Sequence, residues 1–162
     1  MVLTSFFEKS SQVEQSIIDI LNLEITEDGL LSNIEDIYVG EKSDRFDYPS
    51  IWIIEESTKP SEKGIGPKST EIDESIYQFY CITYDPDDLE VSRKESRELA
   101  LKVMDTLEYH CLYKKDNEKV FDTITFESLE QTGNSFDSAN YVNFYCLRVN
   151  FKYRRERRFC SN

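Results

Sequence analysis

The chain has 162 residues, of which 39% are hydrophobic and 13% aromatic, so it is long and apolar enough for one domain with a buried core. It carries 19 basic and 32 acidic residues, which gives a formal net charge of −13. A duplex-binding protein needs a basic face that replaces phosphate counterions, and such a face is not the average property of this chain. A strongly acidic surface also repels anionic lipid.

The first part of the chain predicts a helix followed by two strands. Residues 34–39 form a short strand candidate, and Tyr48-Pro49 introduces an apolar strand at residues 50–55. Before them, residues 2–22 fit an amphipathic helix. The apolar side of this helix is expected to contain Leu3, Phe6, Phe7, Val13, Ile17 and Leu21.

Residues 56–70 predict an exposed, flexible arm. This segment contains Pro60, Gly64, Gly66 and Pro67 among serine and lysine residues. Proline and glycine at this density are typical of loops and hairpin tips. We therefore expect the arm to project from the body of the domain.

A strand over residues 72–84 alternates two largely apolar or aromatic sets, which indicates an interior strand or one with both faces covered. Asp87 or Asp88 is a good N-cap for the helix that follows, because its carboxylate can accept the free N–H groups of the first turn. The expected apolar stripe of this helix is Leu89, Ser96, Leu99, Ala100, Val103 and Leu107. At roughly 23 residues the helix would be ~35 Å long and could cross a four- or five-stranded sheet.

Residues 120–129 and 141–153 alternate again and predict an antiparallel hairpin. Residues 1–162 are thus expected to form a single α+β domain. Its mostly antiparallel sheet would have four to five strands, with an N-terminal helix and one long central helix packed on it.

No pattern in the sequence predicts catalysis, a cofactor or a metal. His110 is the only histidine, and adjacent positions on a helix point about 100° apart, so it does not face Cys111 as a catalytic pair would. We interpret His110 as a residue at the C-terminus of the helix. The segment from Lys63 to Lys68 lacks both the phosphate-loop spacing and a following helix.

The four cysteines contain no CxxC pair, which favours free thiols in a reducing compartment over disulfides or a zinc site. We expect Cys81, Cys111 and Cys146 to be buried in helix or strands. Cys160 lies near the chain end and is expected to be exposed.

The basic residues concentrate at the C-terminus, and residues 152–162 are expected to form a basic tail. The window from Arg148 to Arg158 contains six basic residues and Glu156, so it is net +5. An acidic body with a basic tail suits head-to-tail packing of identical subunits or docking onto an acidic neighbour. The alternatives are a solvated basic terminus and contact of this tail with nucleic acid.

The order of segments resembles the small tail-completion (tail terminator) and head–tail joining proteins of long-tailed phages and prophages. The resemblance covers nearly the whole chain, and it follows an ordered pattern rather than a fingerprint residue. The stretches that carry it are Tyr48-Pro49-Ser50-Ile51-Trp52-Ile53, the Pro/Gly arm, residues 74–82, Ser96-Arg97-Glu98-Leu99-Ala100 and residues 141–153.

The resemblance implies a non-enzymatic subunit that assembles into a ring, such as a hexamer, caps the tail tube and joins it to the head. Its partners would be copies of itself, tail-tube proteins and head–tail connector proteins, with no cofactor, no membrane and no sequence-specific nucleic acid. It would reside in the cytoplasm of the host cell and then in the virion. From the arm and the tail we expect these assembly contacts: Lys59, Lys63, Ile65, Lys68, Arg154, Arg155, Arg157 and Arg158.

Two other function classes stay open from the sequence. The first is a cytoplasmic protein-binding module of a prophage or host, monomeric or dimeric. The second is a metal-dependent nuclease, which would require acidic residues clustered at strand ends. No segment approaches the ~20 apolar residues of a membrane span.

Overall fold

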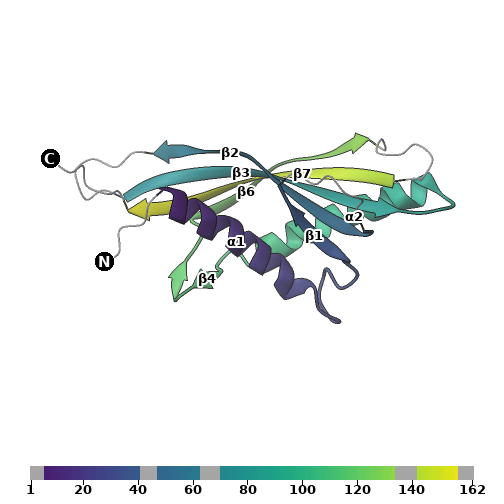
Figure 1. Cartoon of the computed structure of the whole chain (residues 1–162), viewed down its shortest axis with the longest axis horizontal. Helices are drawn as coiled ribbons and strands as arrows, with labels where there is room; N and C mark the ends of the chain where they lie inside the picture. The colour runs from purple at the N-terminus through teal and green to yellow at the C-terminus, as the bar shows by residue number, and fades with distance from the viewer. Residues whose placement is uncertain (1–5, 41–46, 63–69, 134–141, 157–162) are drawn as a thin grey trace.

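The computed structural model describes residues 6–40, 47–62, 70–133 and 142–156. Two helices pack on one face of a five-stranded sheet (Figure 1), which confirms the predicted α+β fold class. In chain order the elements are α1 (Phe6–Glu24), β1 (Asp36–Val39), β2 (Ser50–Glu62), β3 (Thr70–Tyr84), α2 (Leu89–Tyr109), β4 (Lys114–Lys115), β5 (Glu118–Lys119), β6 (Thr123–Gly133) and β7 (Val142–Glu156).

The sheet has the strand order β1-β2-β3-β7-β6. Strands β2, β3, β7 and β6 are antiparallel to their neighbours, and only the short β1 runs parallel to its partner β2. The predicted hairpin of the last two strands is confirmed, and β3 is the central strand, as its two apolar sets indicate. Ser50–Ile53 of β2 pair with β1, so the rest of β2 lies beyond the end of β1.

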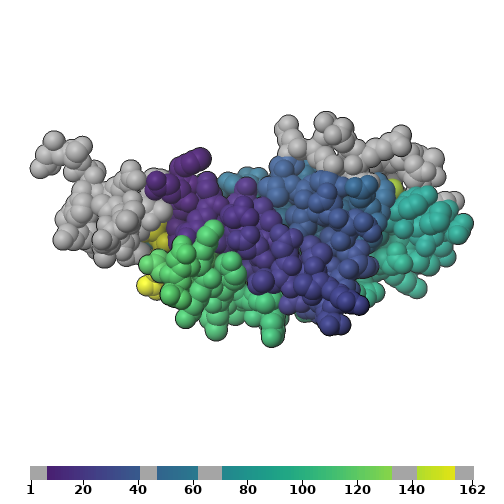
Figure 2. All heavy atoms as spheres, turned by 60° about the horizontal axis from the view of Figure 1, so that its bottom comes forward, coloured from purple at the N-terminus to yellow at the C-terminus, as the bar shows by residue number. Residues whose placement is uncertain are grey.

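The core lies between the helices and one face of the sheet. Fully buried side chains of β3, such as Tyr77 and Phe79, meet Ile17 of α1 and Val103 of α2 in one cluster. Each large apolar side chain buried in this way stabilises the fold by about 1.5–3 kcal/mol relative to exposure. The two helices and the sheet are therefore held by one continuous apolar contact. Figure 2 shows α1 and the segment containing β4 and β5 lying side by side on this helix-bearing side.

Helix α2 begins with the expected cap. The Asp88 carboxylate accepts hydrogen bonds from the backbone N–H groups of Glu90 at 2.9 Å and Val91 at 3.4 Å. Among the residues of the predicted apolar stripe, Leu89 is not buried, since 38% of it is exposed, whereas the others are. Leu89 is the first residue of the helix.

The predicted arm is shorter than the sequence indicated. Residues 56–62 belong to β2, and Thr58, Lys59 and Pro60 pair with Ser75, Glu74 and Asp73 of β3. The ladder of β3 bonds one side of this segment, and an edge strand tolerates proline because its other side needs no ladder bond. Two register shifts, between Glu55 and Ser57 and between Pro60 and Glu62, interrupt the pairing. Residues 63–69 of the arm lie outside the described residues.

The first part of the predicted tail is also a strand, because residues 152–156 continue β7 to its end at Glu156. The β4–β5 hairpin was not predicted. Asp116 and Asn117 join its two strands with positive φ angles of 52° and 64°. This conformation suits a two-residue hairpin turn, for which asparagine and aspartate are preferred. The adjacent Asp116 and Asn117 were the feature of the sequence that could have predicted this hairpin.

Replacing the cap tests the start of α2. We expect Asp88→Ala to lower the free energy of unfolding by about 1 kcal/mol, because two backbone N–H groups lose their acceptor. Asp87→Ala is the matched control, since Asp87 is exposed and the cap is its neighbour. Urea denaturation of both variants measures the difference. Equal stability of the two variants would contradict the capping role.

The C-terminal ends of α1 and α2 are joined by one polar contact. His110 is the C-cap residue of α2, as its position in the sequence indicates, and its Nε2 lies 2.9 Å from Glu24 Oε1 at the end of α1. The hydrogen bond with His110 holds the pKa of the Glu24 carboxyl below its ordinary value of 4.5. A lowered folded-state pKa means that the ionised form stabilises the fold.

This contact makes stability pH-dependent in a defined direction. Because the pKa of Glu24 is lowered, its contribution is present above pH 4.5 and is lost as pH falls through the folded-state pKa. We expect Glu24→Gln to lower the melting temperature at neutral pH and to have little effect in strong acid. Glu27→Gln is the control, because Glu27 is exposed in the loop after α1. A melting-temperature difference that persists unchanged to low pH would contradict this role.

Candidate interaction surface

Both described helices lie on the same face of the sheet, and we call the opposite face, which carries no described helix, the bare face. In β3 the helix side carries Tyr77 and Phe79, and the bare face carries the alternating residues Ile76, Gln78 and Tyr80. No described helix or strand packs across this second face. A sheet face of this kind is available for contact with solvent or with a partner.

The middle of the bare face is crossed by an ion-pair network. Arg148 of β7 donates from Nε and Nη2 to both oxygens of Glu56, at 2.8 and 2.9 Å, and from Nη1 to Glu127 of β6. Asn150 donates to Glu74 at 3.3 Å. The hydrogen bonds from Arg148 lower the pKa of the Glu56 carboxyl and keep it ionised. The network therefore links all four long strands side to side.

The charges on this face nearly balance each other. Described side chains on the bare face of β2, β3, β7 and β6 provide four bases and four acids, paired in part as above, and Asp122, just before β6, adds a fifth acid that pairs with Arg154. The bases are Lys59, Arg148, Lys152 and Arg154, and the acids are Glu56, Glu74, Glu127 and Glu130. The acidic character of the chain thus does not come from this surface.

One end of the bare face is aromatic instead of charged. The ring centroids of Trp52 and Tyr80 lie 5.3 Å apart, and those of Tyr48 and Tyr84 lie 5.7 Å apart. They flank a small buried cluster that includes Ile82 and Phe144. Near this end a cleft of about 430 Å³ opens between the Tyr48-Pro49 turn, the end of β3 and α2. Its lining residues are Asn33, Tyr48, Pro49, Thr83, Tyr84, Glu95, Glu98, Leu99 and Lys102.

Arg155, expected as an assembly contact, has a partner inside the domain. Its Nε lies 2.6 Å from Asp73 Oδ2, and Nη2 pairs with Glu71. Asp73 is fully buried, and only 10% of the Arg155 side chain is exposed. The guanidinium neutralises two carboxylates on the helix side of β3, so this residue is held within the fold rather than presented to a neighbour.

The other expected contacts differ in position. Lys59 and Arg154 have side chains that are 62% and 68% exposed, and they pair with Glu74 at 3.2 Å and Asp122 at 3.1 Å. Exposed pairs of this kind contribute little to stability and can exchange partners. Lys63, Ile65, Lys68, Arg157 and Arg158 lie outside the described residues. Arg154 and Arg155, the described assembly candidates of the tail, are therefore already paired within the domain, which the sequence did not show.

The two arginines at the end of β7 provide a matched comparison. We expect Arg155→Met to destabilise the domain by about 3 kcal/mol, because it leaves Asp73 buried without a counter-charge. Arg154→Met should change stability by less than about 1 kcal/mol, since its ion pair is exposed. Chemical denaturation measures both. Adding Asp73→Asn to Arg155→Met should restore part of the loss, and equal effects of the two single variants would contradict the assignment.

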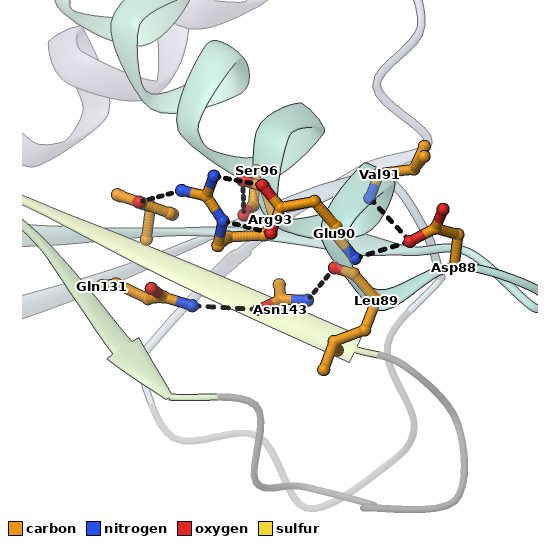
Figure 3. A network of polar contacts seen from close by, with 9 residues as sticks. Asp88, Leu89, Glu90, Val91, Arg93, Ser96, Gln131 and Asn143 are labelled. Atoms are coloured by element: carbon orange, nitrogen blue, oxygen red, sulfur yellow. Dashed lines mark hydrogen bonds and ion pairs between the residues drawn. The ribbon is translucent and has the colours of Figure 1, made fainter.

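A second polar network fixes the N-terminus of α2 to the sheet (Figure 3). Arg93 contacts the Glu90 carboxylate and donates to Tyr145 Oη at 3.3 Å. Asn143, which is buried, donates to the backbone carbonyl of Leu89 at 3.2 Å and accepts from Gln131 at 3.3 Å. These side chains satisfy one another, so we assign them an anchoring role.

The three described cysteines are free thiols, and Cys160, expected to be exposed, lies outside the described residues. Cys81 and Cys146 are buried, and burial raises the pKa of both thiols, that of Cys146 to about 11. Cys111 is exposed, so the expectation that it would be buried is wrong. It follows the end of α2, where the chain has left the core. Within the described ranges, no group of three or more His, Cys, Asp or Glu side chains is arranged to hold a metal ion.

A hollow of about 550 Å³ lies between α1 and the free part of β2. Phe7, expected on the buried side of α1, lines it and is 78% exposed. At this hollow the buried Tyr77 places its hydroxyl 3.3 Å from Glu14 and 3.2 Å from Glu55. The phenol has one proton and donates to one carboxylate at a time. Ser10, Ser11 and Thr58 complete the lining.

The outer edges of the sheet are the remaining candidate surface. β6 pairs with β7 on one side only, and β2 beyond Ile53 pairs with β3 only, as far as the described residues extend. Unpaired strand edges present a row of N–H and C=O groups that can bond to another chain. Which strands form the edges depends on the strand order, and the periodicity of the sequence does not predict that order.

Two comparisons with known proteins, one with family models and one with curated sequences, identify no relative. No protein-family model matches the sequence, and a search of curated proteins gives no match. None of the helices in the described residues has the length and apolar character needed to cross a membrane.

Proposed function

We propose that this chain is a non-enzymatic structural protein that works by assembling with copies of itself. The observation that carries the proposal is that, among the described residues, the sheet ends in an unpaired edge on both sides and has one face without a helix. A surface on one side of a subunit that fits a different surface on the other side generates a ring when the rotation closes. The two edges supply two such surfaces.

The proposed setting is the phage tail that the sequence resembles. There the chain would cap the tail tube as a ring, such as a hexamer, and join it to the head through tail-tube and connector proteins. A net charge of −13 suits a subunit near a DNA passage, because it disfavours retention of nucleic acid. Lys59 and Arg154 remain the described candidates for assembly contacts, since both are exposed.

A monomeric protein-binding module is the second candidate function. The cleft of about 430 Å³ with Tyr48, Tyr84 and Leu99 in its lining favours it, because aromatic side chains are common anchors at protein contacts. This function requires no self-association, which separates it from the first.

The absolute mass in solution tests the two functions. We expect light scattering over a concentration series to show species well above the 19.1 kDa of one chain, approaching a closed oligomer as concentration rises. The series is repeated at low and high salt, and strand contacts should persist at high salt because backbone hydrogen bonds carry no net charge. A strict monomer at every concentration would contradict self-assembly and favour the binding module.

A further inference from the structure

We propose that the two edges of the sheet, which no described strand pairs, are the two halves of one contact, in which β6 of one copy pairs with β2 of the next. This inference rests on the proposed self-assembly and names the surface that performs it. The assembled sheets would be continuous from copy to copy. The bonded residues would be Thr123–Phe126 of one copy and Glu55–Lys59 of its neighbour.

Strand direction makes this pairing possible without turning the neighbour over. β2, β3, β7 and β6 alternate in direction, so β6 is antiparallel to β2 within one sheet. A second copy moved sideways across the strands therefore brings an antiparallel β6 to the β2 edge. Its helices stay on the same side, so the helix side and the bare face both continue across the junction.

The register shows which residues would meet. Two straight rows of paired residues cross the whole sheet. They are Glu55–Tyr77–Val149–Phe126 and Lys59–Glu74–Lys152–Thr123. A neighbour displaced along these rows places Thr123–Phe126 opposite Glu55–Lys59. This stretch of β2 starts where β1 no longer covers the edge and ends before Pro60, which has no N–H to donate.

Apolar side chains complement each other on the helix side of the junction. Ile124, Phe126 and Leu129 of β6 are only partly buried at one edge of the core. At the other edge, Phe7 is 78% exposed and lines the hollow beside Glu55 and Thr58. The neighbour's β6 side chains would enter this hollow and cover Phe7. Within a single copy, Phe7 and the three β6 side chains are each incompletely covered.

Charge favours this pairing over a symmetric contact between two β6 strands. On the bare face β6 carries Glu127 and Glu130, and the β2 edge carries the exposed Lys59. In the register above, Lys59 lies opposite Thr123 of the neighbour, one residue from Asp122. Glu127 of the neighbour lies beside Glu56, whose charge is paired with Arg148 within each copy. Two β6 strands would bring acids to acids, and like charges opposite each other are destabilising.

Disulfide trapping tests the contact directly. Both samples carry Cys111→Ser and Cys160→Ser, so that Cys81 and Cys146, which are buried, are the remaining native thiols. Lys59→Cys protein is mixed with a size-tagged Thr123→Cys protein and oxidised with copper–phenanthroline. We expect a cross-linked heterodimer in the mixture that exceeds the product from either protein alone. Glu118→Cys, at an exposed position on β5, replaces Thr123→Cys as the matched control.

The outcomes separate this contact from the proposed function. Oligomers of the unmodified chain without a 59–123 cross-link above the Glu118→Cys control would overturn the edge pairing and leave self-assembly standing. Self-linked Thr123→Cys protein would overturn it in favour of a β6–β6 dimer. A monomer in light scattering that also fails to cross-link would overturn both. A 59–123 cross-link in the mixture supports the pairing even when association is weak.

Phe7 provides a second readout. We expect Phe7→Ser to weaken self-association roughly tenfold with unchanged circular dichroism, because an aromatic anchor at the centre of a contact is lost. Leu23→Ser is the matched control on α1, since Leu23 is 51% exposed at the far end of the helix. Equal association of the two variants would overturn the role of the hollow.

Discussion

One-sided packing is the constraint on which this structure depends. Both helices bury their apolar sides against the same face of the sheet, so each long strand has two different surroundings. The helix side requires apolar residues such as Phe79 and Leu147, and the other side must stand in contact with water or with a partner. The cross-strand ion pairs of Arg148 meet that requirement, because they hold polar side chains in place without a helix above them.

The same constraint explains the buried charges. Toward the beginning of β3 the helix-facing positions are Glu71 and Asp73, and Arg155 neutralises both. A buried ion pair of this type stabilises little relative to apolar packing, but breaking it is strongly unfavourable. It therefore fixes the pairing of β3 with β7 more than it adds to stability. The Tyr77 hydroxyl, within hydrogen-bond distance of Glu14 and Glu55, likewise fixes the position of α1 relative to β2.

Local patterns predicted the fold well, and distant contacts were beyond them. Alternation over residues 72–84 and 141–153 identified the two strands. The expected cap at Asp87 or Asp88 located the start of α2, which begins at Leu89 directly after Asp88. The predicted length of the arm was wrong. The loop propensity of this segment is outweighed by its pairing with β3, so Thr58, Lys59 and Pro60 belong to strand β2. Arg155 was interpreted as a surface charge because its partner Asp73 lies 82 positions away. Phe7 was assigned to the core because periodicity does not show where the sheet ends. The candidate contact surface depends on strand order, which no local pattern contains.

The balanced charge of the bare face has a consequence for any conduit built from this domain. Because four bases and five acids lie close to one another there, their fields largely cancel beyond roughly one Debye length, about 8 Å at physiological salt. A polyanion passing along that face at a distance would meet neither attraction nor repulsion. In an assembly of the proposed kind, this face would interact weakly with a passing polyanion, and the acidic surfaces elsewhere on the domain would favour solubility.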